Sequence, residues 1–158
     1  VQGAGKSWRI RAEELRAEID SSPPLREVMQ TSLLARLHQQ TLASACERFH
    51  PMASRLARWL LMSQDRYQQH QLYLTQQFLA DMLGVRRSGI TVAAGVMQQQ
   101  QFIRYSRGTI TILDRQSLQN MACECYQAGL DDYQSVLGKP QHAENDANVR
   151  QNTVQDMP

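Results

Sequence analysis

The sequence predicts a mainly α-helical fold with one small β-hairpin. Apolar residues recur at the 3.6-residue helical period over several stretches, and only after Gln101 do they alternate with polar ones. The chain has 158 residues, of which 42% are hydrophobic, so it can bury one modest core with appendages. No run approaches the roughly 20 apolar residues that a membrane span needs, and no signal segment opens the chain. We therefore expect a cytoplasmic protein without a membrane partner.

The first half of the chain predicts a short strand and then a long helix. Trp8 to Ile10 has the composition of a strand, and Pro23-Pro24 then interrupts the chain. No further breaker occurs in residues 25–50, and a helix of about 25 residues spans roughly 37 Å. Its apolar face is formed by Met29, Leu33, Leu34 and Leu37. Polar residues interrupt this face further along, so a strict coiled coil is not predicted.

Residues 72–101 predict two short helices joined by a tight turn. Thr75 is placed to cap a helix over Gln76–Leu83, and Gly84 follows where helices commonly end in a left-handed residue. Residues 85–88 are too few for anything but a turn. A second helical stripe then comprises Ile90, Ala93, Ala94 and Met97. Before this pair, an amphipathic helix begins after the corner at His50-Pro51 and should pack beneath it.

The alternating stretch predicts a β-hairpin. Ile103, Tyr105, Ile110 and Ile112 alternate with polar residues, and residues 106–108 (Ser-Arg-Gly) are a plausible turn. Two helices, a glycine-bearing turn and a hairpin are typical of a winged helix-turn-helix, whose second helix enters the major groove of duplex DNA. Residues 116–137 predict one terminal helix, and residues 138–158 a disordered tail.

This arrangement assigns candidate DNA contacts. The exposed residues at the start of the second helix should face base edges; they are Arg86, Arg87, Ser88, Thr91 and Val92. Arginine can donate two hydrogen bonds to guanine O6 and N7. The candidate backbone contacts are Thr75, Gln76 and Gln77 at the start of the first helix, and Arg104 and Arg107 on the wing. The alternative is that these arginines are only a solvated surface.

The distribution of charge favours a polyanionic partner for the middle of the chain. The formal net charge is only +2, but residues 55–115 hold eight basic and three acidic side chains, a local charge of +5. The residues after them come to −4. A basic region in a nearly neutral chain predicts one anionic binding site with salt-dependent affinity.

Three motifs together resemble the carboxy-terminal half of a Crp/Fnr-family bacterial transcription regulator. They are RLARWLL at 55–61, LTQQFLADMLGVRR at 74–87 and IRYSRGTITILD at 103–114. The resemblance implies a homodimer with a cyclic-nucleotide-binding-like sensor barrel, a long dimerisation helix and a winged helix-turn-helix DNA-binding domain. It allows RNA polymerase as a further partner. Arg87 matches the family's principal base-reading arginine, whereas Ser88 and Val92 stand where well-known members have an acidic and a basic reader.

The resemblance also implies a division of the chain. Residues 1–24 would be the remnant of the sensor barrel, 25–50 the dimerisation helix, carrying the apolar face as dimer contact, and 51–137 the winged domain. In a family member about a hundred residues of barrel would precede this segment. The effector, if there is one, therefore cannot be named from this sequence.

Three other features do not favour catalysis or a metal site. Residues 3–7 (Gly-Ala-Gly-Lys-Ser) resemble the end of a phosphate-binding loop, but the full pattern needs a further glycine before Val1, a strand ahead and a helix behind. Cys46, Cys123 and Cys125 are too few and too scattered for a four-ligand zinc site, and reduced cysteines are expected. The histidines sit at no metal-ligand spacing, and no catalytic triad is indicated.

We therefore expect a DNA-binding transcription regulator that acts on a pseudo-palindromic site, with no enzyme activity and no cofactor. The alternative is a winged helix used as a protein-interaction module. Exposed aromatic residues in place of Arg86 and Arg87 would have favoured that second interpretation.

Overall fold

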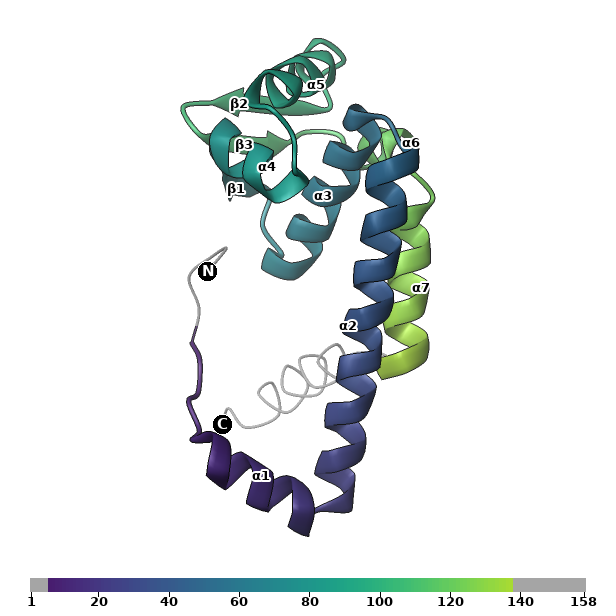
Figure 1. Ribbon diagram of the computed structural model, residues 1–158. Coiled ribbons are helices and arrows are strands. Elements are labelled where there is room, and N and C mark those ends of the chain that lie inside the picture. Colours follow the sequence, from purple (N-terminus) through teal and green to yellow (C-terminus); the bar gives the residue numbers. More distant parts are fainter. Residues whose placement is uncertain (1–5, 138–158) are drawn as a thin grey trace, which may run out of the picture. The chain divides into compact units, whose positions relative to one another are not determined.

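The computed structural model describes residues 6–137 and is mostly helical, as predicted (Figure 1). The elements are α1 (Ala12–Ser21), α2 (Pro23–Phe49), α3 (Met52–Tyr67), β1 (Gln71–Tyr73), α4 (Gln76–Leu83), α5 (Arg87–Gln99), β2 (Ile103–Ser106), β3 (Thr109–Ile112), α6 (Arg115–Met121) and α7 (Cys125–Leu137). The chain divides into two compact units, Val1–Leu37 with Ser135–Pro158, and His38–Gln134. The expected tail, residues 138–158, lies outside the described residues.

The first unit contains no strand among its described residues. Residues 6–11 have no regular secondary structure, and the side chain of Trp8 is wholly exposed. The prediction of a strand at Trp8–Ile10 is wrong, because the sheet formed by the described residues consists of β1, β3 and β2 and does not include this segment. Residues 1–5 lie outside the described range, and Lys6-Ser7 is not followed directly by a helix, since α1 begins at Ala12. The helix that a phosphate-binding loop requires is therefore missing at that position.

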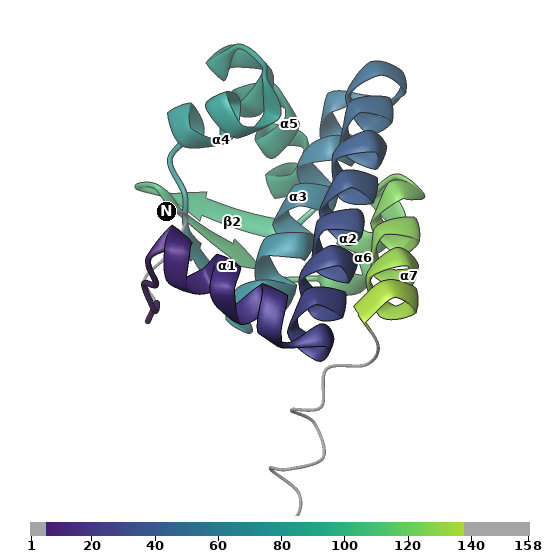
Figure 2. The ribbon, with the colours of Figure 1, turned by 60° about the horizontal axis from the view of Figure 1, so that its bottom comes forward.

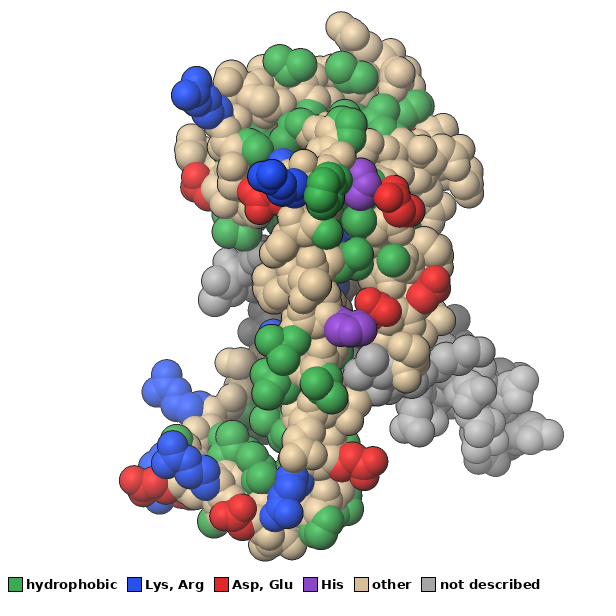
Figure 3. Space-filling model, turned by 45° about the vertical axis from the view of Figure 1, so that its right-hand side comes forward, with side chains coloured by type: hydrophobic (Ala, Val, Ile, Leu, Met, Phe, Trp, Pro, Cys, Tyr) green, Lys and Arg blue, Asp and Glu red, His purple; other side chains and the backbone are tan. Residues whose placement is uncertain are grey.

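The long helix is confirmed and begins two residues earlier than predicted. Pro23 and Pro24 occupy its first turn, where the missing backbone N–H groups would have no intrahelical partner in any case. The 27 residues of α2 correspond to about 40 Å. The predicted apolar face is exposed, with Met29 at 41%, Leu33 at 59%, Leu34 at 61% and Leu37 at 56%. Hydrophobic side chains are visible along the surface of the model in Figure 3.

The core of the second unit is formed by the buried face of α3 and the elements that pack against it. Leu56, Leu60 and Leu61 have no exposed surface, and α3 packs against both α5 and α6. The inner face of α5 contributes Ile90 and Met97, which are also fully buried. α4 packs on α5, and α5 in turn contacts β2. Figure 2 shows α4 and α5 to one side of the sheet and α7 alongside α2.

The wing belongs to a three-stranded antiparallel sheet in the order β1-β3-β2. The hairpin pairs Tyr105 with Ile110 and Arg104 with Thr111. Its turn is Arg107-Gly108, and both residues have positive φ (49° and 79°), the conformation that a two-residue hairpin turn of type I′ requires. β1 was not predicted. It is only three residues long and depends on pairing with β3. Next to this pairing, the backbone N–H of Leu74 donates a 2.7 Å hydrogen bond to the carbonyl of Gly108.

Two helix boundaries differ from the prediction. α5 begins at Arg87, so Arg87 and Ser88 belong to its first turn and not to the preceding loop. The single terminal helix predicted over 116–137 is divided into α6 and α7. Asp114 caps α6 by accepting hydrogen bonds from the hydroxyl and the backbone N–H of Ser117, which hold the pKa of that carboxyl below its usual value. Within the described residues, no helix has the length and apolarity to cross a membrane.

Gly84 and Gly95 should respond oppositely to alanine. A Cβ at Gly95, in the middle of α5, would meet nothing within 4 Å, so Gly95→Ala should raise the free energy of unfolding by about 0.5–1 kcal/mol. Gly84 has φ +64° and a Cβ there would lie 2.8 Å from Glu47 Oε1. Gly84→Ala should therefore lower stability by about 1 kcal/mol or more. Urea unfolding of both variants measures the pair, and two changes of the same sign would contradict this account.

Candidate nucleic-acid interface

α4 is fixed at both ends by local hydrogen bonds. At its start, the Thr75 hydroxyl accepts from the backbone N–H of Phe78 at 3.1 Å, which is the predicted cap. At its end, Gly84 adopts the left-handed conformation and its N–H donates to the carbonyl of Ala80. The guanidinium of Arg55 on α3 adds a 2.6 Å hydrogen bond to the carbonyl of Leu83. Sequence reasoning missed this last contact, because it joins residues 28 positions apart.

α5 presents its first turns to solvent. Arg86 is its N-cap residue, and Arg87, Ser88, Thr91 and Val92 are all exposed. Gln76 on α4 connects the two helices: its Oε1 accepts from Arg87 Nε at 3.3 Å and from the Thr91 hydroxyl at 3.0 Å. The hydrogen bond to Gln76 thus orients the side chain of Arg87 toward α4. Gln77, the neighbouring candidate, instead donates to Asp81 on its own helix.

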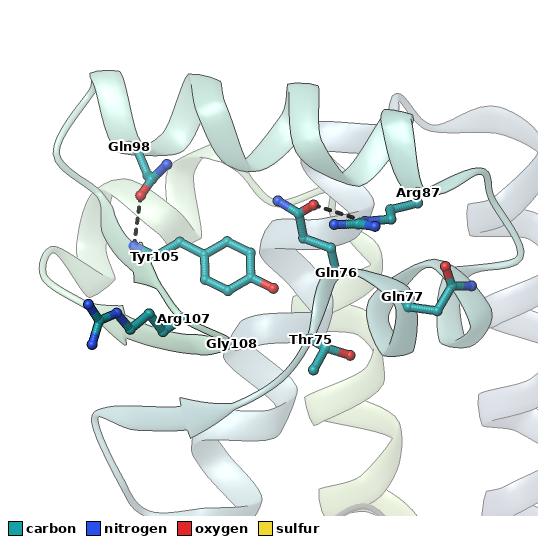
Figure 4. A pocket seen from close by; sticks show the side chains of 8 residues that line it. All are labelled: Thr75, Gln76, Gln77, Arg87, Gln98, Tyr105, Arg107 and Gly108. Atoms are coloured by element: carbon teal, nitrogen blue, oxygen red, sulfur yellow. Dashed lines mark hydrogen bonds between the residues drawn. The ribbon is translucent and has the colours of Figure 1, made fainter.

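An open hollow of about 600 Å³ lies between α4, α5 and the wing (Figure 4). Its lining residues are Thr75, Gln76, Gln77, Arg87, Gln98, Tyr105, Arg107 and Gly108. Five of these were predicted as DNA contacts from three separate segments of sequence: Thr75, Gln76, Gln77, Arg87 and Arg107. The fold therefore brings these residues together around one hollow, with an arginine on each of two opposite sides.

Tyr105 on β2 lines this hollow and connects the wing to α5 and to the segment before α4. Its hydroxyl donates to the carbonyl of Leu74 at 2.8 Å, and its backbone N–H donates to Gln98 Oε1 at 2.8 Å. Burial raises the pKa of Tyr105, with Arg87 acting in the opposite direction, so the hydroxyl remains a donor at neutral pH. Sequence reasoning used Tyr105 only as a strand residue.

Arg104 is not brought to the hollow. Successive side chains on a strand point to opposite faces of the sheet, so Arg104 lies on the other face from Tyr105. It is exposed and pairs in register with Thr111. The turn, in contrast, places Arg107 at the rim of the hollow.

Several of the basic residues counted in the sequence are used inside the fold. Arg55 lies 3.8 Å from Glu47, and Arg58 is 9% exposed, with its Nε donating to the carbonyl of Cys125. Arg115 forms a 2.7 Å ion pair with Asp65. The local charge of +5 therefore overstates the free basic surface. The arginines on the helix-turn-helix and the wing are Arg86, Arg87, Arg104 and Arg107.

The prediction that the cysteines are scattered is wrong. Cys46, Cys123 and Cys125 are all buried and lie with His50 in one cluster, in which the potential ligand atoms are all within 4.8 Å of one another. Their separation in sequence hid this cluster: Cys46 lies in the last turn of α2 and His50 directly follows that helix, whereas Cys123 precedes α7 and Cys125 begins it, more than 70 residues later. Only the fold brings these two segments together.

Comparison with known proteins agrees with this geometry. Residues 54–121 match the model of the Crp-like helix-turn-helix domain. A solved structure of a putative Crp/Fnr-family transcriptional regulator from Eubacterium rectale has 25% sequence identity and a TM-score of 0.59; the match covers 72% of this chain and 53% of that one. The catabolite activator protein of Thermus thermophilus matches at 20% identity and a TM-score of 0.44, over 70% of this chain and 52% of that one. No curated protein matches. The chain thus spans about half the length of these solved proteins.

The Thr75 cap should be measurable as stability of the helix-turn-helix. Thr75→Ala removes the acceptor for the Phe78 N–H and should lower the free energy of unfolding by about 1 kcal/mol. Thr75→Ser keeps the oxygen and is the matched control, with an expected change of a few tenths at most. Denaturant unfolding of the three proteins tests this, and equal losses in both variants would mean that the hydroxyl does not act as a cap.

Proposed function

Because residues 54–121 are a Crp-like helix-turn-helix domain, we propose that this chain is the carboxy-terminal part of a sequence-specific DNA-binding transcription regulator. The working form is a homodimer on a pseudo-palindromic site, with a sensor domain outside this segment. The observation that carries the proposal is the open hollow between α4, α5 and the wing, with Arg87 and Arg107 at its rims.

Arg87 is the residue assigned to base reading. It lies in the first turn of α5, it is exposed, and its Nε is held by Gln76 while the rest of the guanidinium can reach outward. Such a fork can donate two hydrogen bonds to guanine in the major groove. Restricting the side chain before binding reduces the conformational entropy that the contact costs.

The other exposed residues of α5 would supply further contacts. Arg86 and Ser88 flank Arg87, and Thr91 lies one turn further along with its hydroxyl on Gln76. Val92 is 68% exposed, and an apolar side chain at that place suits the C5-methyl group of thymine. Thr75 and Gln77, at the start of α4, and Arg107, on the wing, would contact the phosphate backbone and set register.

The apolar face of α2 supports the dimer. Met29, Leu33, Leu34 and Leu37 are exposed at helical spacing, an arrangement that in a soluble protein usually packs against a partner. A second copy of the same helix would cover this face in a two-fold arrangement. Two-fold symmetry then gives DNA half-sites about one helical turn, roughly 34 Å, apart.

Selection of bound sequences from a random duplex pool, at about 0.15 M salt, tests the proposal. The chain should enrich an inverted repeat. Arg87→Ala should weaken binding to that repeat by about 1–3 kcal/mol and relax the preference at one base pair in each half-site. Arg104→Ala removes the same charge from the other face of the wing and is the matched control, with the selected sequence unchanged.

Two results would contradict these assignments. A loss of affinity in Arg87→Ala that is equal on all sequences would make Arg87 a phosphate contact. The absence of any enriched sequence, both with this chain and with the full-length protein, would favour the alternative of a protein-interaction module.

Arg107 should act through charge alone. Because it sits in the turn of the wing and not on α5, the helix assigned to base reading, Arg107→Ala should weaken binding to all sequences. The slope of log affinity against log salt should become shallower by about one unit, as expected for one lost phosphate contact. Binding titrations at several salt concentrations measure the slope, and an unchanged value would remove the wing from the interface.

A further inference from the structure

We propose that Cys46, His50, Cys123 and Cys125 form a structural zinc site, independent of the DNA-binding surface. The four side chains have the chemistry of zinc ligands. Three thiols and one imidazole are one of the standard combinations for a closed, four-coordinate zinc site. All three cysteines are buried, with exposed fractions of 2%, 8% and 5%, and all four residues belong to the same compact unit.

The distances between the four ligand atoms also fit a single zinc ion. Around a tetrahedral ion with Zn–S of about 2.3 Å and Zn–N of about 2.0–2.1 Å, two sulfurs lie about 3.8 Å apart, and a sulfur and a nitrogen about 3.6 Å apart. The Sγ atoms of Cys46 and Cys123 are 3.4 Å apart, and Cys125 Sγ is 3.5 Å from His50 Nδ1. No pair of ligand atoms exceeds 4.8 Å. Small side-chain adjustments therefore suffice to accommodate a single ion.

The two ring nitrogens of His50 have the contacts expected of a metal ligand. Nδ1 of His50 faces the thiols, whereas Nε2 lies 3.0 Å from a carboxylate oxygen of Glu124. Metal-bound histidines commonly donate their second ring N–H to a carboxylate, which fixes the tautomer and the orientation of the ring. Glu124 stands between the two cysteine ligands in sequence, so one short segment supplies two thiols and the carboxylate that orients the imidazole.

A positively charged side chain lies beside the cluster and would balance the charge of the zinc site. Zn²⁺ with three thiolates and a neutral imidazole carries one net negative charge, which would be costly to bury without a counter-charge. Arg58 is 9% exposed, and its Nε donates to the backbone carbonyl of Cys125, which places a cation beside the cluster. The same arginine would otherwise be a nearly buried charge resting on a neutral carbonyl.

The spacing within each segment fits two-point attachment. Cys46 lies in the last turn of α2 and His50 directly follows the helix, and the backbone N–H of His50 donates to the carbonyl of Cys46, so the two residues stay close together. Cys123 lies in the non-helical link between α6 and α7, and Cys125 is the first residue of α7. With all four positions filled by protein, the ion would have no open site for catalysis and would act as a cross-link between these segments.

A disulfide does not explain the cluster equally well. A sulfur–sulfur bond is about 2.05 Å long, and the sulfurs of Cys46 and Cys123 are 3.4 Å apart. A disulfide between Cys46 and Cys123 would also leave Cys125 and His50 without a role. It is retained as one outcome of the test.

Zinc content of the purified full chain is the test, with His50 substituted in two ways. Protein prepared without chelator should contain about one zinc ion per chain. Cys46→Ser and His50→Ala should lose it, whereas His50→Cys should retain it, because four cysteines also form a closed zinc site. His38→Asn alters an exposed histidine on the same helix and is the matched control, with zinc content unchanged.

A spectroscopic measurement covers the case in which a variant does not fold. The wild-type chain, treated with chelator and titrated with Co²⁺ under reducing conditions, should develop thiolate-to-metal charge-transfer and tetrahedral d–d absorption that saturates at one ion per chain. Added Zn²⁺ should abolish both signals and raise Tm. Wild-type protein without zinc and without a Co²⁺ spectrum would overturn the proposal. So would an intact mass showing a Cys46–Cys123 disulfide, or zinc retained equally by all the variants.

Discussion

The rest of this structure depends on the burial of one face of α3 against α5 and α6. Leu56, Leu60 and Leu61 lose all their exposed surface there, and each such burial contributes about 1.5–3 kcal/mol. Helices as short as the eight residues of α4 or the thirteen of α5 are not stable alone in water. They are held by this core, and the exposed residues of α5 owe their positions to the buried residues behind them.

The parts of the fold that could be predicted from sequence are those set by local chemistry. The bounds of α4 were predicted without error, because the Thr75 hydroxyl and the left-handed Gly84 determine its ends within the helix itself. The hairpin followed from alternation and a glycine in the turn. Five of the eight residues that line the hollow were also predicted as DNA contacts, because the winged helix-turn-helix pattern indicates which positions of α4, α5 and the wing face outward.

The features that could not be predicted depend on contacts between distant residues. β1 is three residues long and exists only because β3 pairs with it. Arg104 and Arg107 looked equivalent in sequence, but Arg104 is paired within β2, whereas Arg107 lies in the turn that the hairpin register defines. The cysteine cluster joins positions 77 residues apart, so its ligands had no recognisable spacing. Charge counting failed in the same way, because it cannot tell Arg115, paired with Asp65, from an arginine on the surface.

The end of α2 is where the long helix is joined to the winged domain, and it is held on two sides. Glu47 lies 3.8 Å from Arg55, which itself donates to the last carbonyl of α4. At the same end of α2, Cys46 and His50 contact the segment that links α6 to α7. The last turn of α2 is therefore connected to α4 through Arg55 and to the start of α7 through the cysteine cluster. Both connections join segments that are far apart in the sequence, so the position of this helix end is set by the tertiary fold and not by local chemistry.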